Sequence, residues 1–106
     1  MKIALAQINA TVGDLDGNAA RLVDMAFQAH KAGATLMLTP ELALCGYPPE
    51  DLALRPDFYD ENARVLQDLA TRLPAGFCMV LGYPLMEDGA RYNAASAIHD
   101  GHIAAT

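Results

Sequence analysis

The sequence predicts an α/β fold built on a strand, a helix and a second strand within residues 3–39. Residues 3–8 and residues 35–39 form two short, almost continuous apolar runs, which are typical of strands buried on both faces. Between these runs, apolar residues recur at the spacing of one helix face. A strand, helix and strand of this length form a βαβ unit, so we expect the two strands to be parallel.

The first helix is expected to begin at Asn18 and to end at Gly33. An asparagine side chain can accept a hydrogen bond from the free amides of a first helical turn. Glycine is a common residue just after the last turn. The predicted apolar face consists of Ala19, Leu22, Val23, Ala26 and Phe27. Pro40 then stops the second strand, because proline cannot donate a backbone hydrogen bond.

The loop of residues 41–55 has little periodicity and contains the pair Pro48 and Pro49. Irregular loops at the ends of strands often carry functional residues, so this loop is a candidate site. A second helix is predicted from about Asp57. Its expected apolar face consists of Tyr59, Ala63, Leu66, Ala70 and Leu73.

The last third of the chain predicts a third buried strand over residues 77–81, followed by an antiparallel hairpin. Turn sequences at Glu87-Asp88-Gly89 and at Asp100-Gly101 flank a possible strand of residues 92–99. Residues 103–106 end inside an apparent strand without a closing element. We therefore expect the domain to be incomplete at its C-terminus.

Composition restricts the classes of function. The 106 residues, 53% of them hydrophobic, suffice for one core. A net charge of -6 disfavours nucleic acid and anionic membrane surfaces as partners. The two cysteines, Cys45 and Cys78, have no disulfide or metal-ligand spacing, which favours a reducing, cytoplasmic location. No apolar stretch has the length of a signal peptide core or a membrane span.

Glu41 is the candidate catalytic residue. It directly follows the carboxyl end of a predicted parallel strand, which is where open α/β sheets bind ligands. A carboxylate that is partly shielded from water there could serve as a general base. A solvated glutamate at a strand end is the alternative interpretation.

We expect the other reactive residues to have structural roles. Cys45 has no histidine or lysine near it in sequence, so we expect it to pack in the core, and Cys78 even more so. His99 and His102 could face each other across a turn, but no third metal ligand accompanies them. Ser96 is the only serine, and neither a nucleophile elbow nor a phosphate-binding glycine loop is present.

Asp14 to Asn18 resemble the start of a calcium loop, but the glycine is misplaced and Met25 occupies the position of the essential glutamate. Helix capping is the preferred interpretation. The chain has two lysines, Lys2 and Lys31, and neither is expected near Glu41.

Four segments resemble, in order, the beginning of nitrilase-type carbon-nitrogen hydrolases: residues 3–9, 39–42, 45–52 and 92–95. The loop Cys45-Gly-Tyr-Pro-Pro-Glu-Asp-Leu52 is most similar to the bacterial glutamine-dependent NAD synthetases. The resemblance implies that residues 1–106 are the N-terminal part of a glutaminase domain. The implied fold is an incomplete αββα sandwich.

The resemblance also implies the chemistry. Enzymes of this family hydrolyse amides with a glutamate, a lysine and a cysteine, and Glu41 matches the glutamate. Tyr47 matches a tyrosine that lines the glutamine pocket. The lysine and the cysteine are expected beyond Thr106, so this chain alone should be inactive. Glutamine is the implied substrate, and the ammonia would pass to a synthetase domain that uses ATP and magnesium.

The resemblance implies no cofactor within this chain, and its expected partners are the rest of its own domain and the synthetase domain. A homo-oligomer is implied for the full-length protein. Two alternatives stay open, namely a stand-alone nitrilase-type amidase and a non-catalytic α/β binding module. Exposed sheet edges and apolar faces also predict poor solubility or self-association of the isolated chain.

Overall fold

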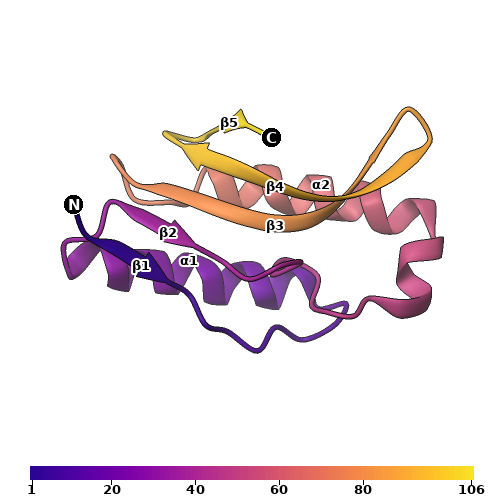
Figure 1. Ribbon diagram of the computed structural model, residues 1–106, viewed down its shortest axis with the longest axis horizontal. Helices are drawn as coiled ribbons and strands as arrows, with labels where there is room; N and C mark the ends of the chain where they lie inside the picture. Colours follow the sequence, from indigo (N-terminus) through magenta and orange to yellow (C-terminus); the bar gives the residue numbers. More distant parts are fainter.

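The computed structural model describes residues 1–106 as one five-stranded sheet with two α-helices (Figure 1). The strands lie in the order of the sequence: β1 Ile3–Leu5, β2 Leu36–Leu38, β3 Cys78–Glu87, β4 Ala90–His99 and β5 His102–Ala105. The first three are parallel, and β3, β4 and β5 are joined by antiparallel pairing. The helices are α1 Leu15–Lys31 and α2 Pro56–Ala70, and a short 3₁₀ helix, η1, spans Glu50–Leu54. The predicted α/β class, βαβ unit and hairpin are confirmed.

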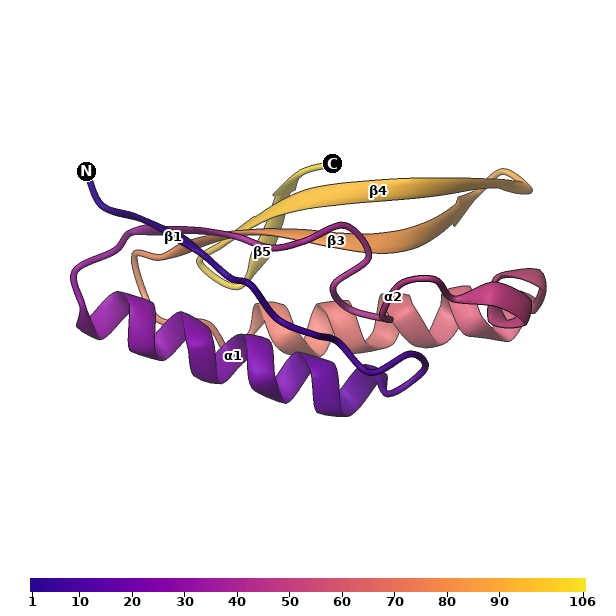
Figure 2. The ribbon, with the colours of Figure 1, turned by 60° about the horizontal axis from the view of Figure 1, so that its bottom comes forward.

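Both helices lie on the same face of the sheet (Figure 2). The core between the two layers contains Met37, Met79, Leu81 and Ile98 from the strands and Leu22 and Leu69 from the helices, each at most 1% exposed. On β1, however, Ile3 and Leu5 are 50% and 69% exposed. The expectation that the first strand is buried on both faces is therefore wrong, because successive side chains alternate and only one face has helices. The second strand shows the same pattern, with Met37 buried and Leu38 exposed.

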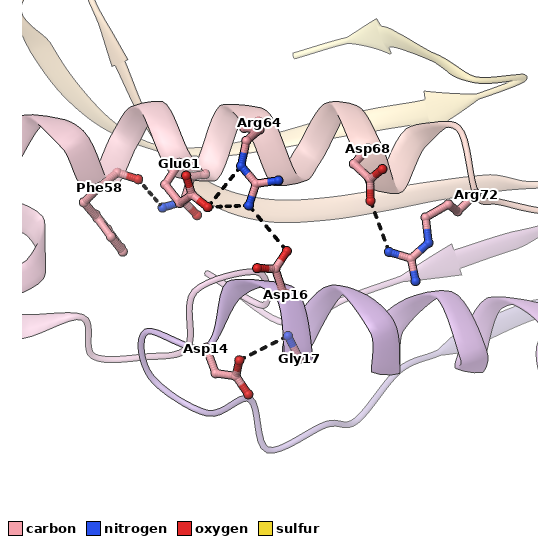
Figure 3. A network of polar contacts seen from close by, with 9 residues as sticks. Asp14, Asp16, Gly17, Phe58, Glu61, Arg64, Asp68 and Arg72 are labelled. Carbon is pink, nitrogen blue, oxygen red and sulfur yellow. Dashed lines mark hydrogen bonds and ion pairs between the residues drawn. The ribbon is translucent and has the colours of Figure 1, made fainter.

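Helix α1 begins earlier than predicted, because Asp14 rather than Asn18 is its N-cap. An oxygen of the Asp14 carboxylate accepts a hydrogen bond from the Gly17 amide at 3.2 Å (Figure 3). Asn18 lies within the first turn and is fully buried. The helix ends as expected, since Gly33 follows it in the left-handed region, with φ +97°. Phe27 is half exposed, so it does not belong to the buried face.

The predicted apolar face of α2 is confirmed at Tyr59, Leu66 and Ala70, whereas Leu73 lies beyond the end of the helix at Ala70. Ala63 is exposed, and the buried positions are Phe58, Tyr59, Asn62, Val65, Leu66, Leu69 and Ala70. This stripe is wide because α2 packs against both β3 and α1. Arg64 links the helices by ion pairs to Glu61 of its own helix and, at 3.5 Å, to Asp16 of α1 (Figure 3). Hydrogen bonding from Arg64 lowers the pKa of Glu61, but exposed pairs of this kind contribute little to stability.

The third strand is longer than predicted, since β3 runs to Glu87 rather than ending at Leu81. All ten residues pair with β4, from Cys78 opposite His99 to Glu87 opposite Ala90. The predicted turns at Asp88-Gly89 and Asp100-Gly101 connect β3 to β4 and β4 to β5. Neither α-helix has the length and hydropathy needed to cross a membrane.

Candidate active site

The candidate site lies where the chain leaves β2 and crosses the edge of β3. Thr39 continues the pairing with β3, because its amide and its hydroxyl both donate to the carbonyl oxygen of Val80, at 3.1 and 2.9 Å. Pairing resumes at Leu44, whose amide donates to the carbonyl oxygen of Gly82 at 3.2 Å. Residues 40–43 therefore form an excursion between two fixed points on β3.

The excursion has an unusual backbone conformation next to the candidate base. Leu42 is buried and has φ +52°, in the left-handed region that residues with side chains rarely adopt. Burial of Leu42 under the loop turns the neighbouring residue outward, and Glu41 is exposed. Such a conformation persists only where the surrounding contacts determine it, and it is common at functional sites.

Gly82 of β3 allows the excursion to lie directly on the sheet. A Cβ atom at Gly82 would stand 2.8 Å from the backbone nitrogen of Leu42 and 2.8 Å from the carbonyl oxygen of Pro40. Both atoms belong to the backbone, so no side-chain movement could relieve the contact. The backbone on either side of Glu41 can therefore take this path only because residue 82 of β3 has no side chain.

The Glu41 side chain points over β3 toward β4, where the Asn93 amide donates a hydrogen bond to Oε1 of Glu41. The two residues line an open depression of about 290 Å³. Its other walls are Thr39, Pro40, Val80, Gly82, Ala94 and Ala95. The expected shielding of the carboxylate from water is absent within residues 1–106, because Glu41 lies on the face of the sheet that no helix covers.

A buried asparagine connects the Glu41 loop to the loop before α1. Asn18 donates from Nδ2 to the carbonyl oxygens of Thr11 and Leu44, at 2.8 and 3.0 Å, and accepts from the Thr11 amide at 2.9 Å. The Gly13 amide adds a further bond to the carbonyl oxygen of Cys45, at 2.9 Å. These hydrogen bonds join the loop before α1 to the loop that carries Glu41.

Tyr47, the candidate glutamine-pocket residue, lies further along the same loop and is 66% exposed. It does not line the depression around Glu41. Its proposed contact with substrate stays a prediction.

The packing role expected for Cys45 is confirmed, because its side chain is fully buried. Its thiol points to the carbonyl oxygen of Gly46 at 3.3 Å, and burial raises the pKa of Cys45 to about 11. A thiol with that pKa is protonated at neutral pH and is a poor nucleophile. Cys78 is only partly buried, contrary to the expectation that it would be the deeper of the two. It lies two residues from Val80, on the sheet face that carries no helix.

The remaining candidates lie elsewhere. His99 and His102 are directly opposite each other on β4 and β5, as predicted, and His99 contacts Asp100 at 3.1 Å. No group of three or more potential metal ligands occurs in residues 1–106. Lys2 donates to the carbonyl oxygen of Ala32 at 2.7 Å, just beyond the C-terminus of α1. Ser96 is buried and bonded to the Tyr83 hydroxyl at 2.6 Å.

The site contains two residues to which sequence reasoning gave no role. Gly82 interrupts no pattern in β3, and Asn93 lies in a strand whose alternation is weak because alanine recurs along it. The resemblance of residues 92–95 to the family was the only sequence signal for Asn93, and that signal carried no information about its partner.

Comparison with known proteins identifies the family. Residues 2–105 match the carbon-nitrogen hydrolase family, and the chain belongs to it. Its curated relatives are glutamine-dependent NAD(+) synthetases. The enzyme from Synechocystis sp. is 50% identical over 80 residues, which are 76% of this chain and 14% of that protein. The curated relatives compared are all much longer, and this chain spans 14% to 19% of their length.

Solved structures agree with this assignment and with the predicted nitrilase-like fold. The glutamine-dependent NAD+ synthetase from Acinetobacter baumannii, solved with ADP, matches 96% of this chain and 19% of its own, with a TM-score of 0.87 and 36% identity. An amidase of the nitrilase superfamily from Nesterenkonia sp. matches 97% of this chain and 40% of its own, with a TM-score of 0.79 and 30% identity. The fold is therefore part of the domain that these two classes of enzyme share.

Proposed function

We propose that this chain supplies the general base, Glu41, for hydrolysis of the side-chain amide of glutamine within a longer polypeptide. One observation carries the proposal: the Glu41 carboxylate is presented on the open face of the sheet by a backbone that Gly82 and Leu42 fix. A base must be held in one place to take a proton in the transition state. The carboxylate also forms no ion pair within residues 1–106.

The proposed reaction needs a nucleophile and an oxyanion stabiliser as well as a base. Glu41 would accept the thiol proton of a cysteine while the sulfur attacks the amide carbon of glutamine. Collapse of the tetrahedral intermediate would break the carbon-nitrogen bond, and the departing nitrogen would take up the proton and leave as ammonia. Water would then hydrolyse the thioester to release glutamate and restore the thiol.

The nucleophile and the lysine would come from outside residues 1–106. Cys45 is unsuitable because its thiol is buried and protonated, and Cys78 lies at the start of β3, opposite His99 rather than beside Glu41. A related amidase supports a cysteine nucleophile: in a glutamate-to-leucine variant of the enzyme from Nesterenkonia sp., the acetamide moiety of fluoroacetamide is added covalently to the active-site cysteine. The bare face of the sheet around Glu41 is where the rest of the domain would complete the site.

The longer polypeptide would use the ammonia for ATP-dependent NAD synthesis, as the names of the curated relatives suggest. Residues 1–106 themselves do not fit ATP or magnesium, since they contain no phosphate-binding glycine loop and no cluster of metal ligands. Those groups would belong to a separate synthetase domain. A cytoplasmic location and a homo-oligomeric assembly are part of the same proposal, and the two unpaired cysteines are compatible with a reducing compartment.

A stand-alone amidase is the second candidate, and the Nesterenkonia structures favour it to a lesser degree. The TM-score is 0.79 or lower for those structures and 0.87 or higher for the two NAD synthetases. The discriminating observation is substrate preference, since a glutaminase should favour glutamine over simple aliphatic amides. A non-catalytic binding module would hydrolyse neither.

The experiment is to follow ammonia release from glutamine by residues 1–106 and by the polypeptide that the uninterrupted reading frame encodes. We expect activity from the long polypeptide alone. Ammonia release by the short chain would show that the lysine and the cysteine are not needed or are assigned wrongly. Inactivity of both proteins toward glutamine, with hydrolysis of acetamide by the long one, would favour the amidase.

A further inference from the structure

We infer that Asn93 is a positioning residue for Glu41, and that its side-chain amide holds one oxygen of the carboxylate so that the other is left to act as the base. This inference rests on the proposed function of Glu41. It concerns a residue of a different strand, 52 positions further along the chain.

The geometry brings the two residues together across an intervening strand. Glu41 follows β2, and Asn93 lies on β4, with β3 between them. Adjacent strands are about 4.8 Å apart, and the excursion that carries Glu41 already lies against Gly82 of β3, so the two side chains meet across β3 alone. At the crossing point β3 presents Gly82, which has no side chain to block the path, and Pro84, which pairs with Asn93.

The alternation of β4 directs Asn93 to the correct face. Ser96 and Ile98 are buried against the helices, and Ala94 lies opposite the buried Tyr83. Asn93 and Ala95 therefore project from the opposite face, next to the excursion that carries Glu41. Of the three residues that β4 contributes to the depression, Asn93 is the only one with a polar side chain. No other β4 residue that lines the depression has a side-chain donor.

The chemistry of the pair suits a base. A carboxylate has two oxygens, and its outer torsion rotates freely unless a hydrogen bond fixes it. The Asn93 amide occupies Oε1, so Oε2 is left to face the open depression. An amide is neutral, so it orients the carboxylate without placing a positive charge next to it, as a lysine or an arginine would.

An exposed asparagine can also make a surface hydrogen bond of no consequence, and substitution by aspartate separates the two interpretations. Asn93→Asp would keep the shape of the side chain but would replace the donor with a second carboxylate. A structural role would make Asn93→Asp milder than Asn93→Ala. A role as donor to Glu41 makes Asn93→Asp the more damaging change, because two carboxylates would face each other.

The test uses the polypeptide encoded by the uninterrupted reading frame and measures kcat and KM for glutamine hydrolysis. Asn93→Ala should lower kcat about 10- to 100-fold with KM almost unchanged, because a charge-assisted hydrogen bond that orients the base acts mainly in the transition state. Asn93→Asp should lower kcat further, while its thermal unfolding midpoint stays close to that of the parent. Asn9→Ala is the matched control, since Asn9 is exposed and its side chain makes no hydrogen bond within residues 1–106.

The outcomes separate this inference from the proposed function. If Glu41→Gln abolishes glutamine hydrolysis while Asn93→Ala and Asn93→Asp leave kcat unchanged, the base is correct and the positioning role is wrong. The inference is also overturned if Asn93→Asp is more active than Asn93→Ala, or if both variants lose cooperative unfolding, since the role is then structural. If Glu41→Gln itself leaves glutamine hydrolysis intact, the proposed role of Glu41 as the base is wrong, and the role of Asn93 is wrong with it.

Discussion

Gly82 and Leu42 approach so closely that a single added carbon would not fit between them: a Cβ atom on Gly82 would lie 2.8 Å from the backbone nitrogen of Leu42. The contact joins β3 to the residue directly after Glu41. The position of Glu41 therefore depends on Gly82, a residue that is remote in sequence and has no side chain.

Gly82→Ala should therefore displace the Glu41 excursion. We expect a loss of stability of about 1–3 kcal/mol, the usual cost of overpacking, together with a fall in glutamine hydrolysis by the long polypeptide. Chemical denaturation and an ammonia assay would measure the two effects. Gly76→Ala is the comparison for backbone strain alone, because Gly76 has φ +72° but its new Cβ atom would meet nothing within 4 Å. Unchanged glutamine hydrolysis by Gly82→Ala would show that the close approach at Gly82 has no special role.

Asn18→Ala should destabilise the protein more than Asn62→Ala, although both asparagines are fully buried. Asn18 bonds Thr11 and Leu44 of two separate loops, whereas Asn62 donates only to the Phe58 carbonyl oxygen of its own helix, at 2.8 Å. Loss of Asn18 leaves the buried carbonyl oxygen of Leu44 and the partly buried backbone of Thr11 without a partner, so we expect the difference to be about 1–3 kcal/mol in the free energy of unfolding. Equal losses in denaturant titrations would contradict a linking role for Asn18.

The stability of the protein should fall in alkaline solution because of Cys45. Burial raises the pKa of this thiol from 9.0 to about 11 in the folded state, so the folded protein holds a proton that the unfolded chain releases between these values. The contribution is fully present below pH 9 and is lost as the pH rises toward 11, by on the order of 2 kcal/mol. Other groups titrate in this range, so the measurement is the difference in pH dependence between the parent and Cys45→Ala. Parallel curves would mean that the thiol titrates normally.

Residues 1–106 alone should self-associate through the bare face of the sheet. Ile3, Leu5 and Leu38 are between 37% and 69% exposed on that face, and exposed apolar patches of this kind favour association. Sedimentation equilibrium should show a smaller species for Leu5→Lys than for the parent chain. Phe27→Lys provides a comparison, because Phe27 is 50% exposed on α1 rather than on the sheet. A monomeric parent chain that unfolds cooperatively would refute this prediction.

Local patterns in the sequence predicted the order and type of the elements. The apolar runs, the helical spacing and the turns at Asp88-Gly89 and Asp100-Gly101 each depend on residues close in sequence, and the structure has all of them. It was harder to predict which faces of the strands and helices are buried. A short apolar run such as residues 3–5 looks the same whether one face or both are covered, because burial depends on where the helices pack.

The candidate site was only partly predictable for the same reason. Glu41 was predicted as the candidate base because its place after a strand and its surrounding motif are local features. Its hydrogen bond to Asn93, the clearance at Gly82 and the bond from Asn18 to Leu44 all join residues that are between 26 and 52 positions apart. Asn18 was taken for a helix cap because capping is the commonest role of an asparagine at that position, and the tertiary contacts of the two loops override that preference.

The most direct test of the account is Glu41→Gln in the polypeptide encoded by the uninterrupted reading frame, with NAD formation measured once with glutamine and once with free ammonia as the nitrogen source. The substitution keeps the size of the side chain and its contact with Asn93 but removes the base. We predict that glutamine-dependent formation is lost while ammonia-dependent formation is retained. Undiminished NAD formation from glutamine by the Glu41→Gln protein would contradict the account.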